Sequence, residues 1–229
     1  SHDTAVNHLS VFRLMMAVIT FGMVFYLLPG LWGAPLKLLS GVLPPAEYSE
    51  APHGFGPTET SVLKNTDDAY STYIERNKHG ILYFKNDYAR ALAYAKKQHK
   101  PLLVDFTGHA CANCRKTEDY VWPDPQVTRL LNDNYVLVSL YVDDKRPLDP
   151  SEYDTVTWYG KTRIIRDIGD KFKYMEETRY GQSAQPLYVI LNHAEEPLLP
   201  VRGYNADIAG YIKWLQAGIA AFKNSNVKP

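Results

Sequence analysis

The sequence is poor in cysteine and has no excess of charge of either sign. Only 2 of its 229 residues are cysteines, and Lys and Arg together number 25, the same as Asp and Glu. A secreted scaffold held by disulfides needs more cysteines, spread along the chain, so that class is excluded. A formal net charge of zero creates no overall field that attracts a polyanion. We therefore expect no nucleic-acid partner.

The composition is that of a folded protein. Hydrophobic residues make up 45% of the chain and charged residues 22%, which favours a packed core over disorder. The length allows one sizeable domain with an appendage. Because the first residue is Ser1 and not Met, we expect the chain to be part of a longer protein, with Ser1-His2 as a tag remnant.

A long apolar run lies near the N-terminus. Residues 14–36 carry no charged side chain over 23 positions, and a helix needs roughly 20 such residues to cross the hydrocarbon core of a membrane. Pro29-Gly30 is expected to kink or end this helix. We predict that residues 11–36 contact the membrane, within a helix-and-flank segment over residues 1–43. A signal peptide and a buried core helix are the alternatives, but the run is long for a signal and no clear small-residue cleavage site follows it.

Two further segments complete the predicted organisation. Residues 44–66 are interrupted by proline and glycine and are interpreted as a linker, and residues 67–224 as the globular domain. Its first part, residues 67–77, is either a helix or an irregular lead-in. Alternation of strands and helices predicts an α/β fold with a mixed central sheet flanked by helices. Strands are predicted over residues 80–84, 101–106, 135–142, 185–191 and 198–204, and helices over residues 87–98 with Asn86 as N-cap, 115–121, 125–132 and 207–222.

The two cysteines stand three positions apart, at a strand-to-helix junction. Cys111 follows a buried strand and a short loop, and Cys114 falls where the next helix begins. The positive end of a helix favours a thiolate, which is the reactive form of cysteine. The spacing lets Cys114 reach back to Cys111. We therefore predict a redox-active disulfide, with Cys111 as nucleophile and Cys114 as the resolving thiol, and no other cofactor.

A metal site is the competing interpretation of the same residues. Tetrahedral zinc needs four ligands, and the chain has no second cysteine pair. His109 would supply a third ligand, but no clear fourth presents itself. A metal-binding or metallochaperone module that uses Cys111, Cys114 and His109 is thus the alternative to redox chemistry. A redox-inert interaction domain is a third possibility.

Residues 100–127, KPLLVDFTGHACANCRKTEDYVWPDPQV, resemble the C-terminal thioredoxin-like domain of the DsbD family of membrane-bound thiol:disulfide interchange proteins. The family pattern is a strand ending in an aspartate, a C-x-x-C pair, a basic helix with an acidic residue, and Asp-Pro-Gln-Val. The later sequence Gln185-Pro186-Leu187-Tyr188 resembles the start of the strand at which this fold has a cis proline. The resemblance covers residues 9–43 and 80–222, and implies a thioredoxin-like fold preceded by a transmembrane helix.

The resemblance also implies roles for individual residues. Asp105, which ends the strand before the cysteines, would be a buried acid that accepts or relays a proton. Glu118, one helical turn after Cys114, would face the same pocket. Substrate contact would come from Gln185 and Pro186, and from His109 and Ala110 in the loop before Cys111. An aromatic residue often precedes the cysteine in this family, so the sequence His109-Ala110 before Cys111 departs from the family pattern.

A place in the cell follows from the same resemblance. Members of this family carry electrons from cytoplasmic thioredoxin across the bacterial inner membrane. An upstream membrane domain of the same protein would be the electron donor, and periplasmic thiol–disulfide proteins the acceptors. The domain would then lie in the periplasm, with Arg13 on the cytoplasmic side, and would act as a protein-disulfide reductase with a link to cytochrome c biogenesis.

The segment over residues 143–184 is longer than the matching link of a minimal thioredoxin. Residues 155–166 alternate around Tyr159-Gly160-Lys161 and predict a hairpin, and residues 170–180 predict a helix. We expect this insertion, which precedes the proline strand, to border the active site and shape partner choice. A structural elaboration at a far edge is the alternative.

Overall fold

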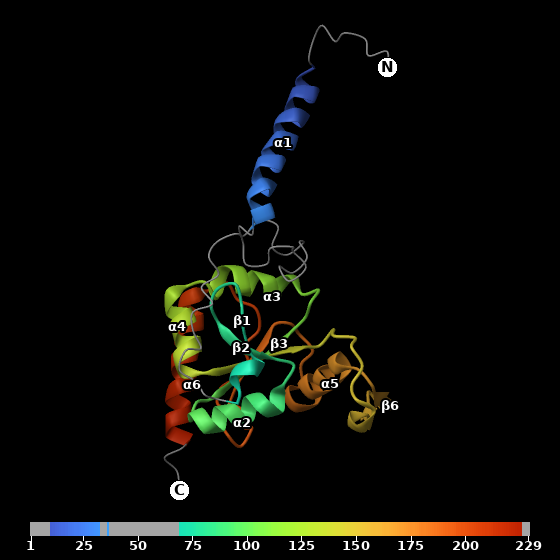
Figure 1. Ribbon diagram of the computed structural model, residues 1–229, viewed down its shortest axis with the longest axis vertical. Coiled ribbons are helices and arrows are strands. Elements are labelled where there is room, and N and C mark those ends of the chain that lie inside the picture. The colour runs from blue at the N-terminus through green and yellow to red at the C-terminus, as the bar shows by residue number, and fades with distance from the viewer. Residues whose placement is uncertain (1–9, 33–35, 37–68, 226–229) are drawn as a thin grey trace. The chain divides into compact units, whose positions relative to one another are not determined.

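The computed structural model describes residues 10–32, 36 and 69–225 (Figure 1). The chain divides into two compact units, Ser1–Thr60 and Ser61–Pro229. The predicted linker over residues 44–66 lies outside the described residues.

The described part of the first unit is a single apolar helix. Helix α1 (Val11–Leu27) begins after Ser10, whose hydroxyl accepts a hydrogen bond from the Arg13 N–H, and none of its residues is buried. A 3-10 turn, η1 (Leu28–Trp32), follows where Pro29 cannot continue the α-helix. The span Val11–Gly30 is long and apolar enough to cross a membrane. A signal sequence near the N-terminus passes the same test of length and hydropathy, so both identities are compatible with this helix.

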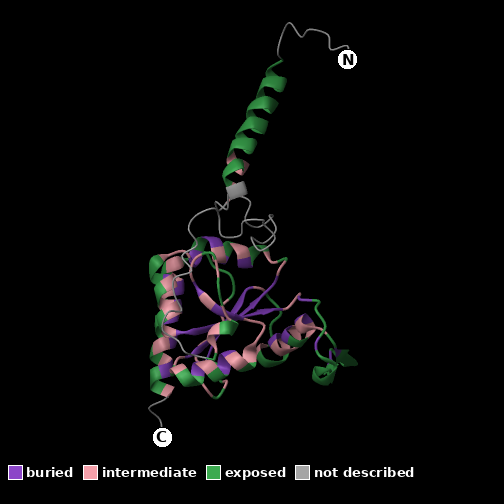
Figure 2. Cartoon of the chain, viewed as in Figure 1, coloured by how far each residue is buried: buried purple, intermediate pink, exposed green. Residues whose placement is uncertain are grey.

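The second unit is built on a five-stranded mixed sheet. Its strand order is β1-β2-β4-β3-β7, in which the three inner strands run parallel and the two edge strands run antiparallel to their neighbours. Every residue of β3, β4 and β7 is buried, as Figure 2 shows. Such continuous burial matches their unbroken apolar character. The strands are β1 (Ile74–Arg76), β2 (Leu82–Lys85), β3 (Leu102–Thr107), β4 (Val136–Tyr141) and β7 (Leu187–Leu191).

Helices cover both faces of this sheet. On one face, α2 (Tyr88–Gln98) and α5 (Ile168–Tyr180) pack through Leu92 and Phe172 onto a core with Phe106 and Val138. The other face carries α3 (Ala112–Lys116), its π-helical continuation η5 (Thr117–Val121), α4 (Pro125–Asn134) and α6 (Ile208–Ser225). The expected α/β architecture, with a mixed sheet flanked by helices, is confirmed.

One expectation about element boundaries is wrong, and for a second the structure decides between the two alternatives. Asp87, and not Asn86, caps α2, because its carboxylate accepts the Arg90 N–H at 3.1 Å. Asn86 has a positive φ of 56° and instead bonds Tyr141 N–H and Asp144. Residues 69–77 form no α-helix; they contain the 3-10 turn η4 (Ser71–Tyr73) and edge strand β1. The irregular lead-in was therefore the better of the two alternatives.

The predicted strand over residues 198–204 is also not a regular strand. It runs beside β7 through isolated bridges, with the Leu198 N–H bonded to the Ile190 carbonyl at 2.8 Å and the Tyr188 N–H bonded to the Arg202 carbonyl at 2.8 Å. Pro200 lies inside this stretch and has no N–H to donate, which interrupts the ladder.

Residues 143–184 contain the two predicted elements, but these belong to different parts of the domain. The hairpin of β5 (Asp154–Trp158) and β6 (Lys161–Ile165) is confirmed. Its buried residues form a small apolar cluster with Leu148, against which Ile168 and Tyr174 of α5 pack. Its turn, Tyr159-Gly160, has positive φ at both residues, 52° and 70°, as a tight hairpin requires. Helix α5 instead contributes Phe172 to the main core. Only the hairpin is an addition to the central architecture.

Candidate active site

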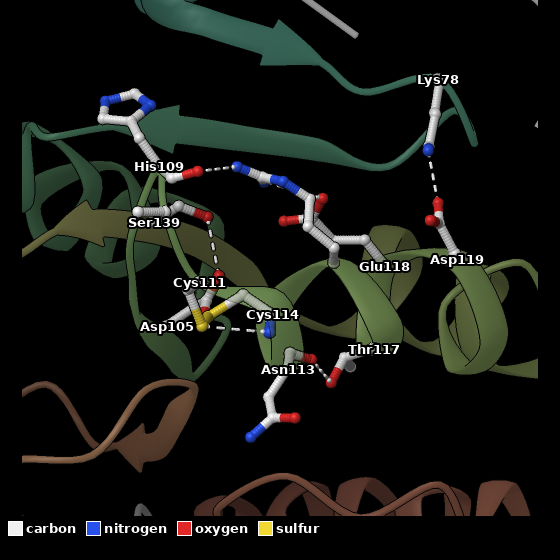
Figure 3. Close-up of polar contacts among 12 residues, drawn as sticks. Lys78, Asp105, His109, Cys111, Asn113, Cys114, Thr117, Glu118, Asp119 and Ser139 are labelled. Carbon is white, nitrogen blue, oxygen red and sulfur yellow. Dashed lines mark hydrogen bonds and ion pairs between the residues drawn. A yellow bond between two sulfur atoms is a disulfide. The ribbon is translucent and has the colours of Figure 1, made fainter. Parts of the chain in front are cut away.

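Cys111 and Cys114 are joined by a disulfide at the junction of β3 and α3 (Figure 3). Their sulfurs are 2.09 Å apart and their Cα atoms 5.3 Å apart. Cys111 is the N-cap of α3, and its Sγ accepts a hydrogen bond from the Cys114 N–H at 3.1 Å. The sulfur of Cys111 thus lies at the positive end of a helix, where a thiolate is favoured.

The two cysteines differ in exposure. Cys114 is only 2% exposed, whereas Cys111 is half-buried. A partner approaching from solvent therefore meets Cys111 and not the buried Cys114. This asymmetry favours Cys111 as the attacking sulfur and Cys114 as the resolving one.

Asp105 is a buried acid on β3, the strand that leads to the cysteines. One of its oxygens accepts a hydrogen bond from the Ser139 hydroxyl at 3.1 Å, and the other has no protein partner among the described residues. Burial, with a smaller contribution from the nearby negative charge of Glu118, raises the pKa of Asp105 to about 8. A carboxyl group with this pKa can hold or release a proton near neutral pH.

Glu118 lies one helical turn after Cys114, as the sequence predicted. Burial raises its pKa, while the positive charges of Arg115 and Lys78 oppose that rise. The Arg115 guanidinium is 3.3 Å from the Glu118 carboxylate. Lys78 also pairs with Asp119, the next residue along the helix (Figure 3). Asp105 and Glu118 are thus close enough for the charge of one to shift the pKa of the other.

The loop before Cys111 is held from two sides. The backbone N–H groups of His109 and Ala110 donate to the two carboxylate oxygens of Asp143, at 2.8 and 2.9 Å. From α3, the Arg115 guanidinium donates to the His109 carbonyl at 2.7 Å. These contacts fix the backbone that presents the Cys111 sulfur.

The imidazole of His109 is directed away from the two sulfurs (Figure 3). It stacks on the ring of Tyr141, with 4.2 Å between ring centroids. The structure therefore does not assemble the ligand set of His109, Cys111 and Cys114 that the metal interpretation requires. Within the described ranges, no group of three or more His, Cys, Asp or Glu side chains is arranged to hold a metal ion.

Gln185 and Pro186 lie beside the same loop. β7 runs antiparallel to β3 with Leu187 opposite Phe106, so the residues before β7 lie next to those that follow β3. Their peptide bond is cis, as the family resemblance implied. Pro186 is buried and Gln185 half-buried. The candidate substrate-contacting residues from both segments thus gather at one edge of the sheet.

Three residues at this site were not predicted as site residues. Asp143 follows β4, a strand parallel to β3, and the carboxyl ends of parallel strands meet at one edge, so its position was accessible from the sequence. The Arg115 clamp and the Ser139 contact depend on side-chain geometry. No sequence pattern singled them out.

Known proteins are similar to this chain over part of its length. A family model described as thioredoxin-like matches residues 83–192. A thioredoxin from Thermus thermophilus, solved in solution, is 22% identical with a TM-score of 0.45, over 63% of this chain and 92% of that one. A structure titled DsbH oxidoreductase is 17% identical with a TM-score of 0.45, over 70% of this chain and 94% of that one. No curated protein matches the chain. The match to the thioredoxin-like family model lies within the second unit, and none of these matches names the DsbD family.

Proposed function

We propose that this thiol:disulfide oxidoreductase of thioredoxin-like fold is a protein-disulfide reductase, the terminal relay that passes electrons from a membrane domain to disulfides of the cell envelope. The observation that carries the proposal is the unequal exposure of the two bonded sulfurs, half-buried Cys111 and 2% exposed Cys114. Such a pair offers one sulfur to a partner and keeps the other to resolve the complex.

The first step is an attack by the Cys111 thiolate on one sulfur of a substrate disulfide. A bond forms between Cys111 Sγ and that sulfur, and the second substrate sulfur leaves as a thiolate that takes up a proton. The helix end behind Cys111 and the basic side chains of Arg115 and Lys116 favour the attacking anion. The product is a mixed disulfide on Cys111.

The second step resolves this mixed disulfide from inside the protein. Cys114 loses its proton and attacks Cys111 Sγ, which forms the Cys111–Cys114 bond and releases the remaining substrate sulfur as a thiolate. Asp105 is the group we assign to accept the Cys114 proton, because its pKa of about 8 lies close to that of a thiol. In total, two electrons and two protons reach the substrate, and the protein ends in the disulfide form described above.

The cycle closes when a dithiol reduces the Cys111–Cys114 bond again. We assign this role to an upstream membrane domain of the same protein, and the acceptor role to periplasmic thiol–disulfide proteins, with no cofactor beyond the disulfide itself. Helix α1 supports this arrangement because it is long and apolar enough to anchor the chain in the bacterial inner membrane. Arg13, which lies near the start of the helix, supports an orientation with the domain in the periplasm.

The test uses the full chain in detergent, with matched serine variants of the two cysteines. Reduced wild-type protein should reduce insulin disulfides, Cys111→Ser should be inactive, and Cys114→Ser should accumulate a covalent adduct with the substrate. Full activity of Cys111→Ser would overturn the proposal. Stoichiometric zinc or copper bound through both thiols of the reduced protein would instead favour the metal-binding alternative.

A further inference from the structure

Helix α5 contains a carboxylate that takes no part in the exchange steps above. Glu176 is 0% exposed, in the same layer as the apolar Phe172. Burying an acid costs free energy unless hydrogen bonds compensate for the lost water. Burial raises the pKa of Glu176 to about 7, although the hydrogen bonds that it accepts from Ala184 and Gln185 act to lower this pKa. An apolar side chain would fill this position at less cost, so the contacts of Glu176 need an explanation.

Both oxygens of Glu176 point to the segment that precedes Pro186. Oε1 accepts a hydrogen bond from the Ala184 backbone N–H at 3.0 Å, and Oε2 accepts one from the Gln185 side-chain amide at 2.8 Å. Glu176 therefore fixes one backbone group and one side chain in consecutive residues, eight and nine positions further along the chain.

This segment lies where a substrate chain would meet the protein. The antiparallel register of β7 on β3 places residues 184–186 beside the loop that carries Cys111. Ala184 is exposed and Gln185 is half-buried, so both are reachable from solvent. Gly203 lies on the other side of Pro186, where a Cβ would come within 3.8 Å of the Pro186 carbonyl oxygen. This segment is irregular backbone that leads directly into β7, so a substrate chain that lies beside Cys111 would pass along it.

We propose that Glu176 is a positioning residue, which holds the segment of Ala184 and Gln185 in the shape that receives a polypeptide substrate next to Cys111. The proposal rests on the proposed reductase function and adds a determinant of substrate class to it. A small disulfide needs only the half-buried Cys111. A polypeptide disulfide must in addition align its backbone with residues 184–186, and only this second requirement involves Glu176.

The experiment compares two disulfide substrates, insulin and oxidised glutathione, with the full chain in detergent. Glu176→Met keeps a similar side-chain length but removes both acceptors. We expect it to raise KM for insulin about tenfold, the size of effect that the loss of a buried hydrogen bond produces. The kcat for insulin and the rate with oxidised glutathione should change less than about twofold, because the sulfur chemistry is untouched.

Three further variants sharpen the result. Glu176→Gln keeps one acceptor for the Ala184 N–H, so its KM for insulin should return most of the way to the wild-type value. Gln185→Ala removes the other end of the contact from a half-buried position, so it serves if Glu176→Met does not fold, and it should raise KM for insulin in the same direction. Glu152→Gln is the control, since this exposed carboxylate bonds Lys171 of α5 at 2.8 Å and not the segment before Pro186. It should leave both substrates unchanged.

The outcomes separate the two proposals. A wild-type protein that reduces neither substrate refutes the reductase function itself. A functional wild type whose Glu176→Met and Gln185→Ala variants keep their KM for insulin refutes the positioning role alone. Equal losses with insulin and with oxidised glutathione also refute it, because they show a general structural effect.

Discussion

The Asp143 carboxylate receives the His109 backbone N–H at 2.8 Å, which ties the end of β4 to the loop that presents Cys111. The same carboxylate takes the next N–H, that of Ala110, at 2.9 Å. Because these bonds involve backbone groups, the loop keeps its shape whatever side chains residues 109 and 110 carry. The absence of an aromatic residue before Cys111 therefore alters the surface of the site and not its framework.

Removing this carboxylate should weaken the fold and the presentation of Cys111. Asp143→Ala leaves two N–H groups of the loop without their acceptor, and we expect the free energy of unfolding to fall by about 1–3 kcal/mol. Denaturant unfolding of the disulfide form, followed by circular dichroism, measures this loss. Asp133→Ala, a change at an exposed position of α4, is the control and should alter stability by less than about 0.5 kcal/mol. Equal effects in the two variants would contradict the prediction.

Asp105 should make the folded protein less stable as the pH rises. Its pKa is about 8 in the folded state against an ordinary value of 3.8, so between these values the folded chain holds a proton that the unfolded chain has released. Stability is therefore full below about pH 4 and declines up to about pH 8, at up to about 1.4 kcal/mol per pH unit. Asp105→Asn removes this decline.

The measurement is the difference in unfolding free energy between Asp105→Asn and wild type across this range, with the disulfide intact in both. The advantage of Asp105→Asn should be absent near pH 4 and reach a few kcal/mol near pH 8. At the same time the resolving step should slow by about a hundredfold, because Cys114 loses its proton acceptor. A pH-independent stability difference would show that Asp105 is not the titrating group.

The sequence predicted the position of the active-site cysteines better than it predicted the elements at the edges of the sheet. The C-x-x-C spacing after a buried strand located Cys111 and Cys114, and the strand alternation predicted the mixed sheet. These predictions succeeded because the start of a helix and the end of a strand depend on residues that are close together in the sequence. The lead-in at β1 and the interrupted stretch near Pro200 depend on pairing with distant strands, and short segments do not encode that.

The polar contacts around the site were the least predictable part. Glu176 meets Ala184 and Gln185 only because α5 packs on the sheet next to the start of β7. The sequence placed this helix inside an insertion that was expected to border the active site, but it assigned no role to Glu176. A buried carboxylate looks like any surface glutamate in a helical pattern until tertiary packing is known, so its significance comes from the structure.

The hairpin of β5 and β6 should be separable from the exchange chemistry. Gly160 has a φ of 70°, and nothing lies within 4 Å of a Cβ added there. Gly160→Ala thus strains the turn without a clash, and we expect a loss of about 1–2 kcal/mol in unfolding free energy. Insulin reduction should stay within about twofold of wild type, because the hairpin has its own apolar cluster. A large loss of activity would instead support the hypothesis that this hairpin borders the active site.

Glu118 and Arg115 should shift the pH dependence of exchange in opposite directions. The negative charge of Glu118 raises the pKa of Asp105 and the positive charge of Arg115 lowers it. Glu118→Gln should therefore move the pH profile that reports Asp105 to lower pH, and Arg115→Met should move it to higher pH. The measurement is the rate at which reduced protein reduces oxidised glutathione between about pH 5 and pH 9, since this range brackets the pKa of Asp105. Raising the salt concentration should change both shifts little, because the charges are largely buried and poorly screened. Shifts of the same sign in the two variants would show that the profile follows the shape of the loop, which Arg115 also holds through the His109 carbonyl, and not the charge around Asp105.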